Sequence, residues 1–136
     1  MRRAVLALLL LPELVLVAAC GGAATDSGAV PPETIAQQTV LAGADLVGSV
    51  GPGFVITLQQ DGKAVADLKA GTYTLAVTDQ ATTHDFALQA PDGTVTQITD
   101  VPFTGTKTAT VKLTPGVWTY LCQPHAGQMR GSFTVS

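Results

Sequence analysis

From residue 53 onward, hydrophobic residues mostly recur at every second position, which is the period of a β-strand with one buried face. Gly, Pro and Asp residues separate the runs, and these residue types favour turns. The runs are Phe54/Ile56/Leu58, Tyr73/Leu75/Val77, His84/Phe86/Leu88, Ala109/Val111/Leu113, Val117–Cys122 and Met129–Val135. No stretch has a convincing 3.6-residue hydrophobic period. The pattern therefore predicts an all-β domain, an antiparallel sandwich of about seven or eight strands.

The first nineteen residues have a different pattern. Residues 1–3 are basic, an apolar run follows at 4–11 and 14–17, and small residues lead to Cys20. This order of charged, apolar and small residues is typical of a secretory signal peptide. The apolar run is too short for a transmembrane helix, and a Pro and a Glu interrupt it.

The segment Val17-Ala18-Ala19-Cys20 resembles the lipobox of bacterial lipoproteins. That resemblance implies cleavage before Cys20 and attachment of lipid to its sulfur. It also implies an extracytoplasmic protein anchored to the bacterial cell membrane. A plain signal peptide with a chance cysteine, or an uncleaved anchor, remains the alternative.

Residues 21–33 are rich in Gly, Ala, Ser, Thr and Pro and have no apolar period. This composition predicts a tether rather than a folded segment. Residues 34–47 are ambiguous between a short helix, a first strand and more tether. We therefore expect a signal peptide at 1–19, a lipid-anchored and poorly ordered tether at 20–46, and one folded domain at 47–136.

The charge balance excludes one class of partner. After removal of residues 1–19, five basic and nine acidic residues remain, a formal charge of −4. A mildly acidic chain lacks the basic surface that nucleic-acid binding requires, so no nucleic-acid partner is expected.

If Cys20 carries lipid, the mature chain has one thiol, Cys122, and no internal disulfide partner for it. A buried, inert cysteine is a common explanation of a single thiol. Here, however, Cys122, His125 and Met129 fall within one short segment between two predicted strands. A thiolate and a thioether are soft ligands, and imidazole also suits copper. A structural zinc site would be expected to use more Cys or His.

A trigonal copper site needs a second imidazole, and the chain has only two histidines. The second must therefore be His84, which begins a predicted strand 38 residues before Cys122. Sheet packing can bring such a strand end beside the loop. Taken alone, His84 would more often be an ordinary surface or core histidine.

The segment Tyr120–Val135, together with His84-Asp85-Phe86, resembles the ligand-bearing segments of the plastocyanin/azurin (cupredoxin) family. The resemblance covers about residues 47–136 and implies a Greek-key sandwich holding one type 1 copper ion. It implies His84, Cys122 and His125 as the copper plane and Met129 as a long axial ligand. It also implies an electron carrier rather than an enzyme, with weak, transient redox protein partners and a monomeric state.

Two positions depart from the family pattern. The gap of three residues between His125 and Met129 differs from the commonest loops of the family, so Gln128 is an alternative axial ligand. Asp85 stands where the family usually has Asn, at a position that ties the two ligand segments together. A protonated or hydrogen-bonded Asp85 would imitate that tie, whereas an ionised one would place negative charge near copper.

Other functions are less consistent with these residues. A copper oxidase or nitrite reductase needs further histidines, and a Cys–His hydrolase leaves Met129 unexplained. An immunoglobulin-like module without metal leaves an unpaired exported thiol. A copper chaperone or scavenger would use the same ligands, so it remains the alternative to an electron carrier.

Overall fold

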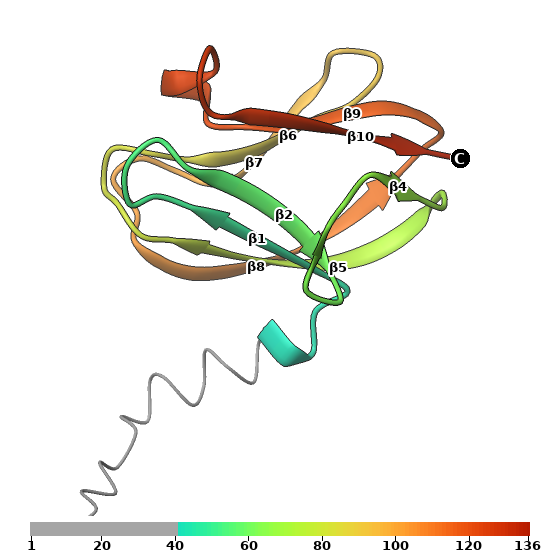
Figure 1. Cartoon of the computed structure of the whole chain (residues 1–136), viewed down its shortest axis with the longest axis horizontal. Helices are drawn as coiled ribbons and strands as arrows, with labels where there is room; N and C mark the ends of the chain where they lie inside the picture. Colours follow the sequence, from blue (N-terminus) through green and yellow to red (C-terminus); the bar gives the residue numbers. More distant parts are fainter. Residues whose placement is uncertain (1–40) are drawn as a thin grey trace, which may run out of the picture.

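The computed structural model describes residues 41–136, which form two β-sheets stacked face to face (Figure 1). Strand order is β3-β2-β1-β5-β8 in the first sheet and β4-β10-β9-β6-β7 in the second. The strands are β1 (Leu46–Val50), β2 (Ile56–Gln60), β3 (Lys63–Ala64), β4 (Asp67–Leu68), β5 (Gly71–Asp79), β6 (Phe86–Gln89), β7 (Val95–Thr99), β8 (Gly105–Leu113), β9 (Gly116–Leu121) and β10 (Arg130–Val135). A single-turn 3-10 helix, η1 (Gln123–His125), connects β9 to β10. Within residues 41–136, no helix is long and apolar enough to cross a membrane.

The all-β sandwich that the sequence predicts is confirmed. Eight of these strands have four residues or more, and β3 and β4 have two each. The sheets are mixed rather than purely antiparallel, because β1 pairs with β5, and β4 with β10, in parallel. Side chains alternate with period two in both kinds of strand, so the hydrophobic pattern does not reveal strand direction.

The first strand begins at Leu46, one residue before the expected start of the domain. Leu46 is buried and pairs with Leu75 of β5. Just before it, the carboxylate of Asp45 accepts a hydrogen bond from the backbone N–H of Thr74, at 2.7 Å. The expected signal peptide, the lipidated Cys20 and the tether up to residue 40 lie outside the described residues.

Alternation along β9 directs the site cysteine toward the core. Trp118 faces the interior, where it lies opposite Phe133 of β10, and its indole N–H donates to the carbonyl of Thr114. Two residues on, Tyr120 stacks against the fully buried Phe86 of β6. Cys122 continues this alternation, so its sulfur also lies on the inner face of the sheet.

Three connections meet at one end of the sandwich, opposite the C-terminus (Figure 1). They are the β1–β2 loop (51–55), the β5–β6 connection (80–85) and the β9–β10 connection (122–129). The candidate ligands lie on the last two of these connections, and the first covers them.

Candidate metal centre

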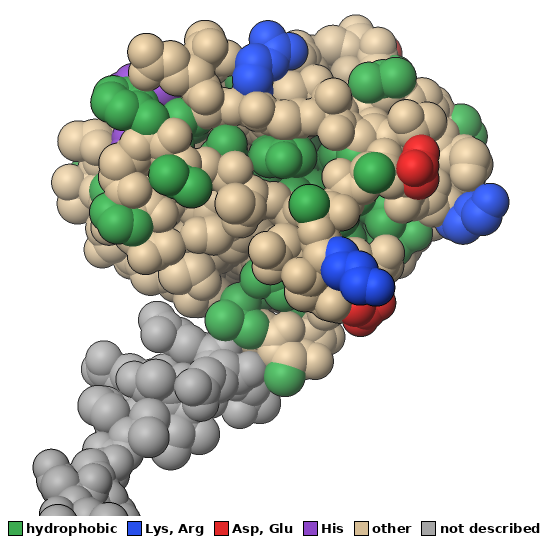
Figure 2. Space-filling model, in the orientation of Figure 1, with side chains coloured by type: hydrophobic (Ala, Val, Ile, Leu, Met, Phe, Trp, Pro, Cys, Tyr) green, Lys and Arg blue, Asp and Glu red, His purple; other side chains and the backbone are tan. Residues whose placement is uncertain are grey.

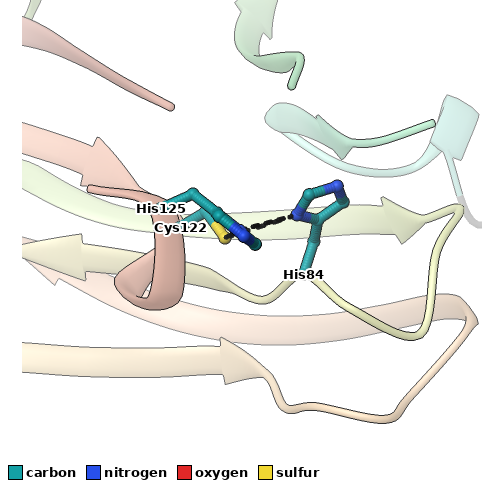
Figure 3. A group of neighbouring side chains, drawn as sticks. All are labelled: His84, Cys122 and His125. Carbon is teal, nitrogen blue, oxygen red and sulfur yellow. Dashed lines mark hydrogen bonds between the residues drawn. The ribbon is translucent and has the colours of Figure 1, made fainter. Parts of the chain in front are cut away.

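Three donor atoms named from the sequence come together at this end of the molecule (Figure 3). His84 Nδ1 lies 3.1 Å from His125 Nδ1, and Cys122 Sγ lies 3.7 Å from the former and 3.5 Å from the latter. His84 enters from the β5–β6 connection, and the other two side chains come from the β9–β10 connection. Folding thus places an imidazole from the middle of the chain against a thiol near its end.

The size of this triangle fits a metal ion. A point within a triangle of sides 3.1, 3.5 and 3.7 Å lies about 2.0 Å from all three corners. Metal–nitrogen and metal–sulfur bonds in proteins are about 2.0–2.3 Å long. The three donors could therefore hold one ion with little movement of their side chains.

Hydrogen bonds within the β9–β10 connection fix two of the donors. The Cys122 N–H donates to the Met129 carbonyl at 3.0 Å, which closes the connection across its base. The N–H groups of Gln128 and Met129 both donate to the His125 carbonyl at 2.9 Å, and the His125 N–H donates to the Cys122 carbonyl at 3.1 Å. Pro124 lies in the first turn of η1, where its missing N–H costs nothing.

The two candidate axial residues lie in different surroundings. Met129 is fully buried at the end of the connection, immediately before β10. Gln128 is exposed to solvent. A thioether that is already removed from water is the better placed of the two to complete an interior site, so burial favours Met129. The set of His84, Cys122, His125 and Met129 fits a type 1 copper site.

His84 is shielded by the β1–β2 loop, which sequence reasoning did not associate with the site. The rings of Phe54 and His84 lie edge to face with centroids 6.0 Å apart, and Phe54 lies 5.1 Å from His125 in the same way. Gly51 has a φ of 70°, and a Cβ there would come within 3.3 Å of the His84 ring. His84 is therefore only 4% exposed, whereas His125 is partly open to solvent.

Asp85 connects the two segments that carry the donors. It is 2% exposed, and its Oδ1 accepts a hydrogen bond from the backbone N–H of Gln123, next to Cys122, at 2.6 Å. Its Oδ2 accepts from the side-chain amide of Gln97 on β7, at 3.1 Å. The carboxylate therefore bonds through both oxygens and holds the start of β6 against the β9–β10 connection.

The surroundings of Cys122 disfavour its thiolate form when no cation is bound. Burial raises the pKa of the Cys122 thiol, and the nearby negative charge of Asp85 adds to that effect. Backbone N–H groups of Asp85 and His125 act in the opposite direction but do not cancel it. A bound cation favours the thiolate and so reverses this balance.

No family model matches the chain, and no curated protein matches it. Solved structures do resemble it. Rusticyanin from Thiobacillus ferrooxidans is 23% identical over 67% of this chain and 75% of its own, with a TM-score of 0.47. Another structure of rusticyanin, described as a copper protein, is 21% identical over 67% and 76%, with a TM-score of 0.48. A reduced amicyanin variant is 16% identical over 66% and 80%, with a TM-score of 0.44. These similarities are of fold, so the case for a metal site rests on the side chains described above.

Proposed function

We propose that this protein is a blue-copper electron carrier, exported and tethered to the cell membrane. The observation that carries the proposal is the convergence of His84, Cys122 and His125 on one point at metal-bonding distance. A thiolate and two imidazoles, with a buried thioether nearby, are the donors that trigonal blue-copper sites use.

The surroundings of the donors favour electron transfer over catalysis. Cys122 and Met129 are fully buried and His84 nearly so, which leaves little room for a substrate between them. The chain has two histidines and both are used, so none is left for a second copper centre. Copper bound here would alternate between two oxidation states and carry one electron. The hydrogen bonds of Asp85 and of the β9–β10 connection hold the donors in place through that change.

Exposed hydrophobic side chains next to His125 suit a brief encounter with a redox partner. Phe54 and Val55 are 61% and 54% exposed, and Phe54 contacts the His125 ring. In Figure 2, histidine atoms reach the surface beside hydrophobic side chains at the upper left, with the visible charged side chains further away. Complexes of electron-transfer proteins are typically small in area and weak. We therefore infer that partners dock on this surface and that the electron passes through the exposed edge of His125.

Titration of Cu(II) into the purified protein tests the proposal. We expect one equivalent to bind and the solution to turn intensely blue, because charge transfer from the Cys122 thiolate to Cu(II) absorbs visible light. Voltammetry of the loaded protein should then show a reversible one-electron couple. A colourless product would refute the copper site. A blue product without reversible electron exchange would favour a copper chaperone or scavenger instead.

Membrane attachment is a separate part of the proposal, supported by the lipobox-like residues before Cys20. Mass spectrometry of protein expressed in a bacterium should find the mature chain beginning at Cys20, with acyl chains attached. In a Cys20→Ser variant the acyl mass should disappear, and the protein should move from the membrane fraction to the soluble fraction. A mature chain beginning elsewhere, without acyl groups, would contradict lipid anchoring.

A further inference from the structure

A second aspartate, Asp79, is buried and lies five residues before His84 in the chain. It is the last residue of β5 and is 2% exposed. Its Oδ1 accepts a hydrogen bond from the backbone N–H of Ala81, at 3.2 Å, and its Oδ2 accepts from the hydroxyl of Thr99, at 2.8 Å. Thr99 lies on β7 and is fully buried, so this bond joins the first sheet to the second through the interior.

The bonds from Asp79 reach both sides of His84. On one side, the carbonyl of Ala81 accepts a hydrogen bond from the His84 N–H, at 3.3 Å, which forms the turn that carries the imidazole. On the other side, the Thr99 hydroxyl accepts from the backbone N–H of Phe86, at 2.9 Å. One carboxylate therefore holds residues 81–86 at both ends, directly through Ala81 and indirectly through Thr99.

The two buried aspartates have complementary connections. Asp85 bonds to Gln123, which joins the His84 segment to the connection that carries Cys122. Asp79 bonds that same segment to β5 of the opposite sheet. Together they fix His84 relative to both layers of the sandwich.

Holding two strands together with a buried carboxylate costs more free energy than holding them with apolar side chains. Removing it from water costs free energy unless hydrogen bonds replace the lost hydration, and apolar side chains pack a core at lower cost. Leu75, Ala76 and Val77, earlier on the same strand, do so here. The bonds that compensate Asp79 go to Ala81 and Thr99, both of which lead to the His84 segment.

We propose that Asp79 is a positioning residue for the metal centre, which fixes the His84 imidazole through the Ala81 turn and through Thr99. This inference rests on the proposed copper function. The hydrogen bonds of Asp79 go to Ala81 and Thr99 rather than to the donor atoms, so it acts by restricting where the imidazole nitrogen can lie. A satisfied buried network of this kind rigidifies the backbone that it joins.

Amide hydrogen exchange in the copper-free protein provides a readout that does not depend on the metal. In Asp79→Ala we expect exchange at the Ala81, His84 and Phe86 amides to accelerate about ten- to hundred-fold, as for loss of a hydrogen bond to a charged group. Asp79→Asn keeps an oxygen for Ala81 and an amide that can donate to Thr99, so it should restore most of the protection. Thr99→Val should accelerate exchange at Phe86 and leave Ala81 protected.

The same variants loaded with copper test whether this rigidity matters to the site. In Asp79→Ala we expect a changed visible and electron paramagnetic resonance spectrum and Cu(II) dissociation about tenfold faster or more, with Asp79→Asn close to the unaltered protein. Asp92→Ala is the matched control, because Asp92 Oδ1 also accepts from the backbone N–H two residues on, at 2.9 Å, but in the β6–β7 turn. It should accelerate exchange at Thr94 and leave the copper spectrum unchanged.

Three outcomes separate the possibilities. The inferred network would be overturned if Asp79→Ala left exchange unchanged at the Ala81, His84 and Phe86 amides. It would also be overturned if the same variant accelerated exchange equally at the Thr94 amide, because the effect would then not be local. An unchanged copper spectrum and dissociation rate, in a protein that does turn blue, would overturn the positioning role alone. Failure of the unaltered protein to bind copper would defeat the proposed function itself. If Asp79→Ala does not fold, Thr99→Val replaces it as the test. Exchange at the Phe86 amide and the copper spectrum are then measured in that variant.

Discussion

Replacing Cys122 by Ser is expected to remove essentially all the intense visible absorption of the copper-loaded protein. The colour requires a thiolate bonded to Cu(II), and Cys122 is the one thiol within residues 41–136. A serine hydroxyl has nearly the same shape but is a harder donor that does not ionise readily at neutral pH, so it cannot replace the sulfur. Visible spectroscopy during a Cu(II) titration measures the colour, and calorimetry of the same titration measures the loss of affinity.

The other cysteine of the chain provides the control. Cys20→Ser removes the sulfur that we propose carries lipid and leaves the proposed copper donors unchanged, so this variant should keep its full colour. A circular dichroism spectrum like that of the unaltered protein should show that Cys122→Ser still folds. Colour that persists in Cys122→Ser, or is lost in Cys20→Ser, would contradict the assignment of the copper thiolate.

The strands were predictable from sequence where one face of a run is buried. Val111 and Leu113 on β8, and Trp118 on β9, alternate with more exposed neighbours as expected. On β5 the alternation is incomplete, because Ala76 is buried together with Leu75 and Val77. The two-residue strands β3 and β4 were not predictable, because two residues cannot show a period. The parallel pairing of β1 with β5 was also hidden, since it depends on which strands meet in the fold.

The candidate donor residues could be named from the sequence for a different reason. Cys122, His125 and Met129 lie close together in sequence, and the chain offers a single further histidine. Their identification needed the chemistry of soft ligands and a count of residue types, and no knowledge of the packing. The structure adds the distance between them: His84 Nδ1 lies 3.7 Å from Cys122 Sγ.

The supporting residues could not be found in this way. Phe54 lies some 30 residues before His84 in sequence and meets both imidazoles only because the β1–β2 loop folds over them. Asp79 and Thr99 look like ordinary strand-end residues until the interior bond between them is known. Supporting contacts of this kind connect separate strands, so no pattern within a short stretch of sequence predicts them.

Replacing Met129 by Gln is expected to keep the blue colour and lower the reduction potential. The colour persists because Cys122 and both imidazoles remain. The potential falls because a thioether is a soft donor that favours Cu(I), whereas an amide oxygen is harder and favours Cu(II). Each tenfold change in the relative affinity for the two oxidation states moves the potential of a one-electron couple by about 59 mV. Voltammetry of the loaded variant measures the shift.

Gln128→Ala is the matched control, since it changes the neighbouring candidate for the axial position. Gln128 is exposed and Met129 is fully buried, so Gln128→Ala should leave the potential within a few millivolts of the unaltered protein. If the potential instead moves in Gln128→Ala and stays constant in Met129→Gln, the axial donor is Gln128. In that case the buried thioether only packs the core, and the β9–β10 connection must rearrange when copper binds, because Gln128 is exposed to solvent.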